Sequence, residues 1–156
     1  QGVPFIRGAH FCLEGDEVRI NHPAYDIGIE EGSIERSQAL WKGPIEPRGI
    51  SRVACQAIVN AQKERRLRWV VVAPDCVLGN SVNFLQLPNA VLDSLAVEHG
   101  SVVEGLLFVA AQLNSEALDL WSKAWAANNN VNNYELESLP LPLPSAEGAL
   151  NYALRQ

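Results

Sequence analysis

The sequence predicts an α+β fold, in which a β-rich N-terminal half presents loops and C-terminal helices brace it. Three observations carry this prediction. The segment Arg52–Ala61 alternates apolar and polar residues as a half-buried strand does, and Leu67–Ala73 contains a β-branched apolar run that ends at a proline. Apolar residues between 102 and 113 recur instead at the spacing of an amphipathic helix.

The β-rich half covers residues 1–88. Val3–Arg7 is predicted to be a short strand that enters a turn at Gly8, and Gly79–Ser81 is predicted to be a turn that leads into a further strand, Val82–Leu87. A short helix is expected at Ser33–Leu40. One alternative stays open, because Ala54–Arg66 also carries small apolar residues at helical spacing.

The helical half covers residues 89–127, and Ser115 is the expected N-cap of its last helix. Leu118, Trp121 and Trp125 repeat on one face of that helix and are expected in the core. Leucine and proline then alternate over Leu139–Pro144, which predicts an extended exit strapped along the surface. A terminal helix is expected at 145–155.

The whole chain, 1–156, is interpreted as one domain from a longer protein, because it contains no methionine. No apolar run reaches the length of a membrane span, and the first residues lack the pattern of a signal peptide. Three cysteines argue against a disulfide framework and predict buried thiols in a cytoplasmic protein. No cysteine and histidine spacing predicts a metal site.

The net charge of −6 is unusual for a protein that binds nucleic acid, since cations supply much of the affinity for phosphates. The charge is unevenly distributed, however. Between Arg48 and Arg68 the chain holds six cations and a single acid, Glu64. This basic stretch fits a face that touches DNA, but composition alone somewhat favours a solvated hairpin without a partner.

Sequence motifs for catalysis are missing from the chain. It contains neither a GxSxG elbow for a nucleophilic serine nor a glycine-rich loop for a nucleotide. Glu14, Asp16 and Glu17 cluster around Gly15, which is better interpreted as a solvated turn than as a metal-dependent nuclease site. We therefore assign no catalytic residue, no metal and no cofactor to this fragment.

Polar side chains on predicted loops point to binding instead. Asparagine amides read adenine or make turns, so the asparagine-rich tract 128–133 leaves both interpretations open. The residues expected near DNA bases are Arg7, His10, Asn80, Ser81 and Asn83. The residues expected on the phosphate backbone are Arg48, Arg52, Arg65 and Arg66.

Three blocks of sequence resemble one family. Pro4–Phe11 looks like a strand that leads into a GxH entry, and Arg52–Phe84 looks like a hairpin with an ERRL turn followed by a GNSxN segment. The third block combines Leu113-Asn114-Ser115, Asn132–Leu136 with the sequence NNYEL, and the exit LPLP from Leu139. Together they resemble the C-terminal target-recognition domain, TaqI-like, of bacterial N6-adenine DNA methyltransferases from restriction-modification systems.

This resemblance implies recognition of a specific double-stranded DNA sequence, with the target adenine positioned for base flipping in a separate catalytic domain. The parent enzyme would use S-adenosylmethionine, and some members of the family are fused to an endonuclease. The catalytic motifs of the family are not in this sequence, so the fragment is expected to be no enzyme. The tract Asn130–Tyr134 is expected to dock the extended exit onto the helices.

Two rival functions remain at this point. The acidic balance and the Leu-Pro exit also fit a protein-interaction or structural module without DNA binding. A small nuclease without a known motif is the second rival, and it would require metal-dependent cleavage by the isolated chain.

Overall fold

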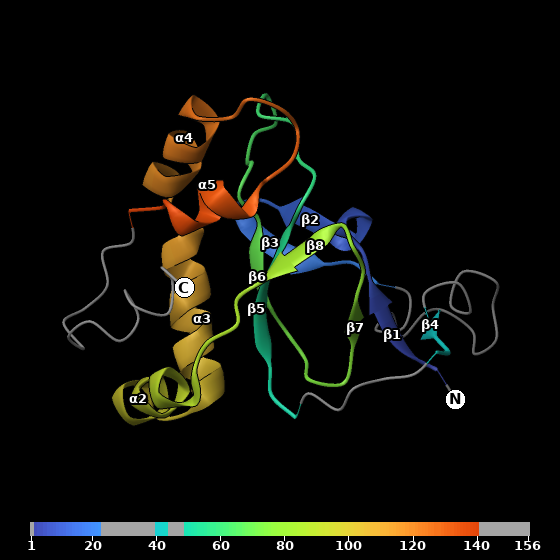
Figure 1. Cartoon of the computed structure of the whole chain (residues 1–156), viewed down its shortest axis with the longest axis vertical. Helices are drawn as coiled ribbons and strands as arrows, with labels where there is room; N and C mark the ends of the chain where they lie inside the picture. Colours follow the sequence, from blue (N-terminus) through green and yellow to red (C-terminus); the bar gives the residue numbers. More distant parts are fainter. Residues whose placement is uncertain (1, 23–39, 44–48, 141–156) are drawn as a thin grey trace.

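The computed structural model describes residues 2–22, 40–43 and 49–140, and there it is an α+β fold (Figure 1). This confirms the predicted class. The strands are β1 (Val3–Ile6), β2 (Phe11–Glu14), β3 (Glu17–Ile20), β4 (Leu40–Trp41), β5 (Arg52–Gln56), β6 (Trp69–Val72), β7 (Val77–Leu78) and β8 (Val82–Phe84). The helices are the 3-10 turn η1 (Gly8–His10), α2 (Asn89–His99), α3 (Val102–Leu113), α4 (Glu116–Ala124) and α5 (Asn133–Glu137).

The central sheet has the order β6-β5-β8, with antiparallel pairing on both sides of β5. Successive side chains of a strand point to opposite faces, and both faces of this sheet are buried. Val53, Cys55 and Trp69 face a core that α2, α3 and α4 complete. Ala54 and Val72 face a second core, which contains Ile6 of β1 and Phe11 of β2. The sheet therefore lies between a helical layer and a layer of strands (Figure 1).

Helices α2 and α3 cross closely because Gly105 has no side chain. A Cβ added at this buried glycine would lie 2.6 Å from the Cβ of Leu95. Gly100 ends α2 with a φ of 92°, a conformation that glycine adopts easily. Ser101 then begins α3, and its hydroxyl accepts a hydrogen bond from the amide of Glu104 at 3.2 Å. The helical layer is thus fixed by local sequence signals.

Several sequence predictions are confirmed, and several are wrong. β1 confirms the strand at Val3–Arg7, and a hydrogen bond of 3.0 Å from the amide of Val82 to the carbonyl of Gly79 closes the expected turn. The helical alternative for Ala54–Arg66 is wrong, because β5 occupies its first residues. Trp125 is 66% exposed, so its expected place in the core is wrong as well, although Leu118 is buried.

Other predictions lie mainly or wholly outside the described residues. These are the helix at Ser33–Leu40, of which only the last residue is described, the strap Leu139–Pro144 beyond residue 140, and the helix at 145–155. Leu139 itself is buried in the helical core. The interpretation of residues 1–156 as one domain stays a prediction.

Candidate functional site

Two polar loops meet at the end of the central sheet where β8 begins. The amide of Gly8, in the loop from Arg7 to His10, donates to the hydroxyl of Ser81 at 2.9 Å. The amide of Gly79 donates to the carbonyl of Ile6 at 2.8 Å. Arg7 and Asn80 are both exposed. The structure therefore brings together four predicted base contacts, Arg7, His10, Asn80 and Ser81.

The two loops are packed so tightly that Gly8 cannot carry a side chain without a shift. A Cβ at this buried position would lie 2.8 Å from the carbonyl oxygen of Ser81 and 3.3 Å from the Cγ of Gln56. The relative position of the loops is therefore set by close backbone contact as well as by the hydrogen bonds.

His10 is held in its neutral form within this pair of loops. Its Nδ1 accepts a hydrogen bond from the backbone amide of Arg7, with 3.0 Å between the two nitrogens. Its ring packs edge-on against the ring of His22, with 4.6 Å between the ring centroids. Burial, together with the nearby charges of His22 and Arg7, lowers the pKa of His10 to about 4. A neutral ring that accepts at Nδ1 carries its proton on Nε2, so this atom is a hydrogen-bond donor.

Asn83, the fifth predicted base contact, belongs to a different environment. It pairs with Cys55, whose side chain lies in the helical core, and its amide Nδ2 donates to the carbonyl of Val131 at 2.8 Å. This hydrogen bond ties β8 to the segment before α5. Asn83 thus lies on the helical side of the sheet, and we remove it from the candidate base contacts.

Arg66 was expected on the DNA backbone, and the structure contradicts this expectation. Its side chain is completely buried, and its Nη1 lies 3.1 Å from the carboxylate of Glu135. Its Nη2 donates to the carbonyls of Asn128 and Asn130 at 3.2 and 2.7 Å. A guanidinium enclosed by these acceptors cannot reach a phosphate. Its role is to hold the loop that precedes α5.

Arg52 is a second correction. It is only 7% exposed, its Nη2 donates to the carbonyl of Cys76 at 2.8 Å, and its guanidinium lies over the ring of Phe84. Arg65 is half-buried and donates to the carbonyl of Asn114. Arg48 lies outside the described residues. Arg52 and Arg66 are therefore buried in separate parts of the fold, so neither belongs to the expected positive face.

A set of backbone hydrogen bonds beside the two loops, which links the chain after β5 to the asparagine-rich tract, was missed by sequence reasoning. The amide of Ala57 donates to the carbonyl of Ser81 at 2.9 Å, while the amide of Val131 donates to the carbonyl of Ala57 at 2.7 Å. Ile58 and Asn130 form an antiparallel bridge, and Ile58 is 54% exposed. The asparagine-rich tract was the only sequence signal. Its pairing with Ile58 could not be predicted, because Ile58 lies about seventy residues earlier.

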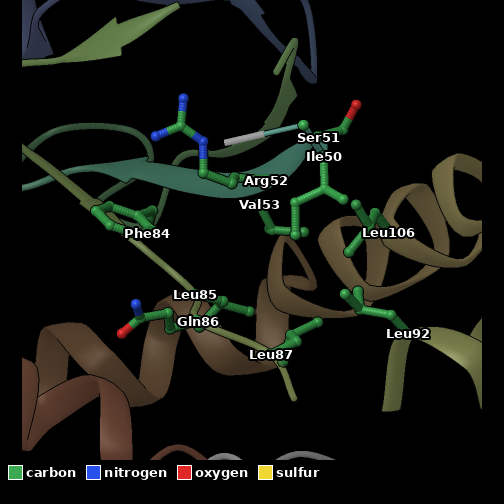
Figure 2. Close-up of a pocket in the computed structure, with 11 residues that line it drawn as sticks. Ile50, Ser51, Arg52, Val53, Phe84, Leu85, Gln86, Leu87, Leu92 and Leu106 are labelled. Carbon is green, nitrogen blue, oxygen red and sulfur yellow. The ribbon is translucent and has the colours of Figure 1, made fainter. Parts of the chain in front are cut away.

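At the other end of β5, an apolar groove opens between the sheet and the helices (Figure 2). Its volume is about 420 Å³, and Ile50, Val53, Leu87 and Leu106 contribute apolar surface to it. Figure 2 shows the guanidinium of Arg52 on the other side of the strand from Val53 and turned away from Leu87 and Leu106. The groove is thus separate from the polar loops, which lie beyond Gln56.

No group of three or more His, Cys, Asp or Glu side chains that could hold a metal ion exists among the described residues. Burial raises the pKa of the Cys55 thiol and of the Cys76 thiol, which keeps both thiols protonated at neutral pH. In the part of the chain that the structure describes, no single helix has the length and apolar composition to cross a membrane. By those two criteria alone, α2 and α3 would pass as a pair bent by 94°.

Comparisons with protein-family models, curated proteins and solved structures found no match to this chain. The resemblance to target-recognition domains therefore remains a prediction from the sequence blocks.

Proposed function

We propose that this chain is a sequence-reading domain for double-stranded DNA that serves a separate adenine methyltransferase domain of a restriction-modification protein. The observation that supports this proposal best is the joining of two polar loops by the hydrogen bond from Gly8 to Ser81. In the proposal, this fragment binds DNA, whereas S-adenosylmethionine and methyl transfer belong to the catalytic domain of the parent chain.

The exposed groups at these loops match the chemistry of base edges in the major groove. The guanidinium of Arg7 can donate two hydrogen bonds to O6 and N7 of guanine, and the amide of Asn80 can pair with N6 and N7 of adenine. Both residues lie on loops whose backbones are fixed by hydrogen bonds to neighbouring segments. A fixed backbone reduces the conformational entropy that is lost on binding, which favours specificity.

The proposal is tested by selecting bound sequences from a pool of random DNA duplexes with the full chain at low salt. We expect the wild type to enrich one sequence pattern. Arg7→Ala is expected to lose about tenfold in affinity and to relax the preference at one base pair. Arg19→Ala is the matched control, since Arg19 is exposed but paired with Glu14 and Glu17 on the β2–β3 hairpin.

Two results would overturn the proposal. The first is the absence of any enriched sequence with the wild type, even at low salt. The second is an equal loss of affinity in Arg7→Ala and Arg19→Ala, which would mean that only net charge matters. If the chain instead binds a protein partner with an affinity that salt does not change, and causes no mobility shift of DNA, the protein-interaction module is supported.

A further inference from the structure

We infer that Arg68 binds a phosphate of the DNA backbone beside the two polar loops, and that it supplies there the positive charge that the buried Arg52 and Arg66 cannot supply. This inference rests on the proposed function and deepens it, because it names a residue that positions the duplex on the loops. Arg68 ends the basic stretch, but no sequence pattern singled it out from the other cations.

The side chain of Arg68 lies against the loop from Arg7 to His10. Its Nη1 is 3.4 Å from the carbonyl oxygen of Phe11, the residue that directly follows this loop, and 3.5 Å from Oε1 of Gln56. Gln56 is close to the loop as well, because a Cβ added at Gly8 would lie 3.3 Å from the Cγ of Gln56. Arg68 is therefore connected to the polar loops through two separate segments.

The guanidinium of Arg68 carries a positive charge that no carboxylate neutralises within the described residues. Its hydrogen-bond acceptors are all neutral: the carbonyl oxygens of Arg65 and Phe11 and Oε1 of Gln56. Arg66, by contrast, is paired with the carboxylate of Glu135. Arg68 is half-buried and has no counter-ion, so an anion that reaches it gains a charge-assisted hydrogen bond.

One nitrogen of this guanidinium is left for a ligand. Nε of Arg68 is 3.2 Å from the carbonyl oxygen of Arg65, and the two contacts of Nη1 are longer than the usual range for such hydrogen bonds. Nη2 makes no hydrogen bond within the described part of the chain and is accessible to solvent. The free end of Arg68 is therefore Nη2, with Nη1 only weakly held.

This arrangement favours a phosphate over a base. An arginine that reads guanine donates to O6 and N7 from both ends of its fork, as the exposed Arg7 is free to do. Arg68 is half-buried and offers mainly Nη2, which is enough for one phosphate oxygen. The neighbouring acceptors hold the side chain in place, so less conformational entropy is lost when the phosphate binds. Phosphate contacts of this kind fix the orientation of a protein on the duplex.

The first test compares the salt dependence of binding between variants. Arg68→Gln is expected to bind the selected duplex and unrelated duplexes about tenfold more weakly, with the enriched pattern unchanged. The slope of log affinity against log salt concentration should fall by about 1, because one phosphate contact is lost. Arg68→Lys keeps the charge and should keep the slope. Arg19→Gln is the matched control, since it removes an exposed arginine that is paired with Glu14 and Glu17.

The second test changes the DNA, so that the wild-type protein can be used without any variant. A methylphosphonate at one position of the selected duplex removes the charge of a single phosphate. The wild type should lose about tenfold in affinity at a position next to the base pair that Arg7 reads, and Arg68→Gln should show no further loss at that position.

The two proposals fail in different ways. If the wild type enriches no sequence, the proposed function fails and this inference fails with it. If the wild type enriches a sequence but tolerates every methylphosphonate beside the base pair that Arg7 reads, only the inference is overturned. It is likewise overturned if Arg68→Gln keeps the wild-type salt slope, or if Arg68→Gln changes the enriched base pattern, which would place Arg68 on a base.

Discussion

The guanidinium of Arg66 lies 3.1 Å from the carboxylate of Glu135, and both side chains are buried, with exposures of 0% and 4%. This ion pair joins the loop before β6 to α5, and Arg66 also holds the carbonyls of Asn128 and Asn130. Arg66, which was expected to contact DNA, thus connects two segments through residues that lie 69 positions apart in the sequence.

Replacing Arg66 should destabilise the fold. Arg66→Met leaves Glu135 buried without its partner, which costs about 3–5 kcal/mol. The free energy of unfolding in urea measures this loss. The double variant Arg66→Met, Glu135→Leu should recover a large part of it, because it removes both charges. Arg19→Met, at an exposed ion pair, should change stability by less than about 1 kcal/mol. Equal losses in Arg66→Met and Arg19→Met would contradict this role for Arg66.

A second prediction concerns Asn114, at the C-terminal end of α3. Its amide nitrogen donates to the carbonyl of Trp69 at 2.7 Å, and its amide oxygen accepts from the backbone amide of Trp69 at 2.9 Å. Asn114→Ala leaves both backbone groups without this partner and should lower the free energy of unfolding by about 2–3 kcal/mol. Asn114→Asp keeps the acceptor and should lose less. No difference between Asn114→Ala and Asn89→Ala in thermal unfolding would refute the prediction.

A third prediction concerns the contact between the two polar loops. Gly8→Ala forces a Cβ against the carbonyl oxygen of Ser81, so the loops must separate, and stability should fall by about 1–3 kcal/mol. Gly49→Ala is the control, because a Cβ at Gly49 meets nothing within 4 Å. If the proposed function holds, Gly8→Ala also loses DNA affinity under conditions in which it is fully folded, whereas Gly49→Ala does not.

The fourth prediction is a dependence of stability on pH that arises at His10. The folded pKa of about 4 is below the ordinary histidine pKa of 6.5, so the unfolded chain binds more protons between these pH values. The stability contributed by neutral His10 is therefore present above pH 6.5 and decreases as the pH falls toward 4. His10→Gln should have a shallower decrease over this range in urea unfolding. Parallel curves for the two proteins would show that His10 does not contribute.

Sequence reasoning found the elements that local patterns determine. The β-branched run at Trp69–Val72 and the stripe on α3 each need only a few neighbouring residues to be recognised. The β2–β3 hairpin was missed although it carries a signal, since Gly15 and Asp16 join two short alternating segments and Gly15 has a φ of 62°.

The candidate site was harder to predict, because burial depends on partners that are distant in the sequence. Arg52 and Arg66 have the composition of a basic surface, but Cys76 and Glu135 determine where their guanidinium groups lie. Arg7 and Asn80, which the structure leaves exposed, were singled out as candidates through their glycine-containing turns, whose conformation is local. Ile58 is 54% exposed and its backbone bridges to Asn130, and no local pattern around Ile58 indicates either.

The paired hydrogen bonds between Asn114 and Trp69 have a consequence for solubility. β6 is at the edge of the central sheet, and an exposed edge is a template on which another molecule can add a strand. The amide of Asn114 satisfies both backbone groups of Trp69, as a neighbouring strand would. This edge is therefore closed to intermolecular pairing at Trp69, and aggregation through this apolar strand is opposed by a single side chain from the helical layer.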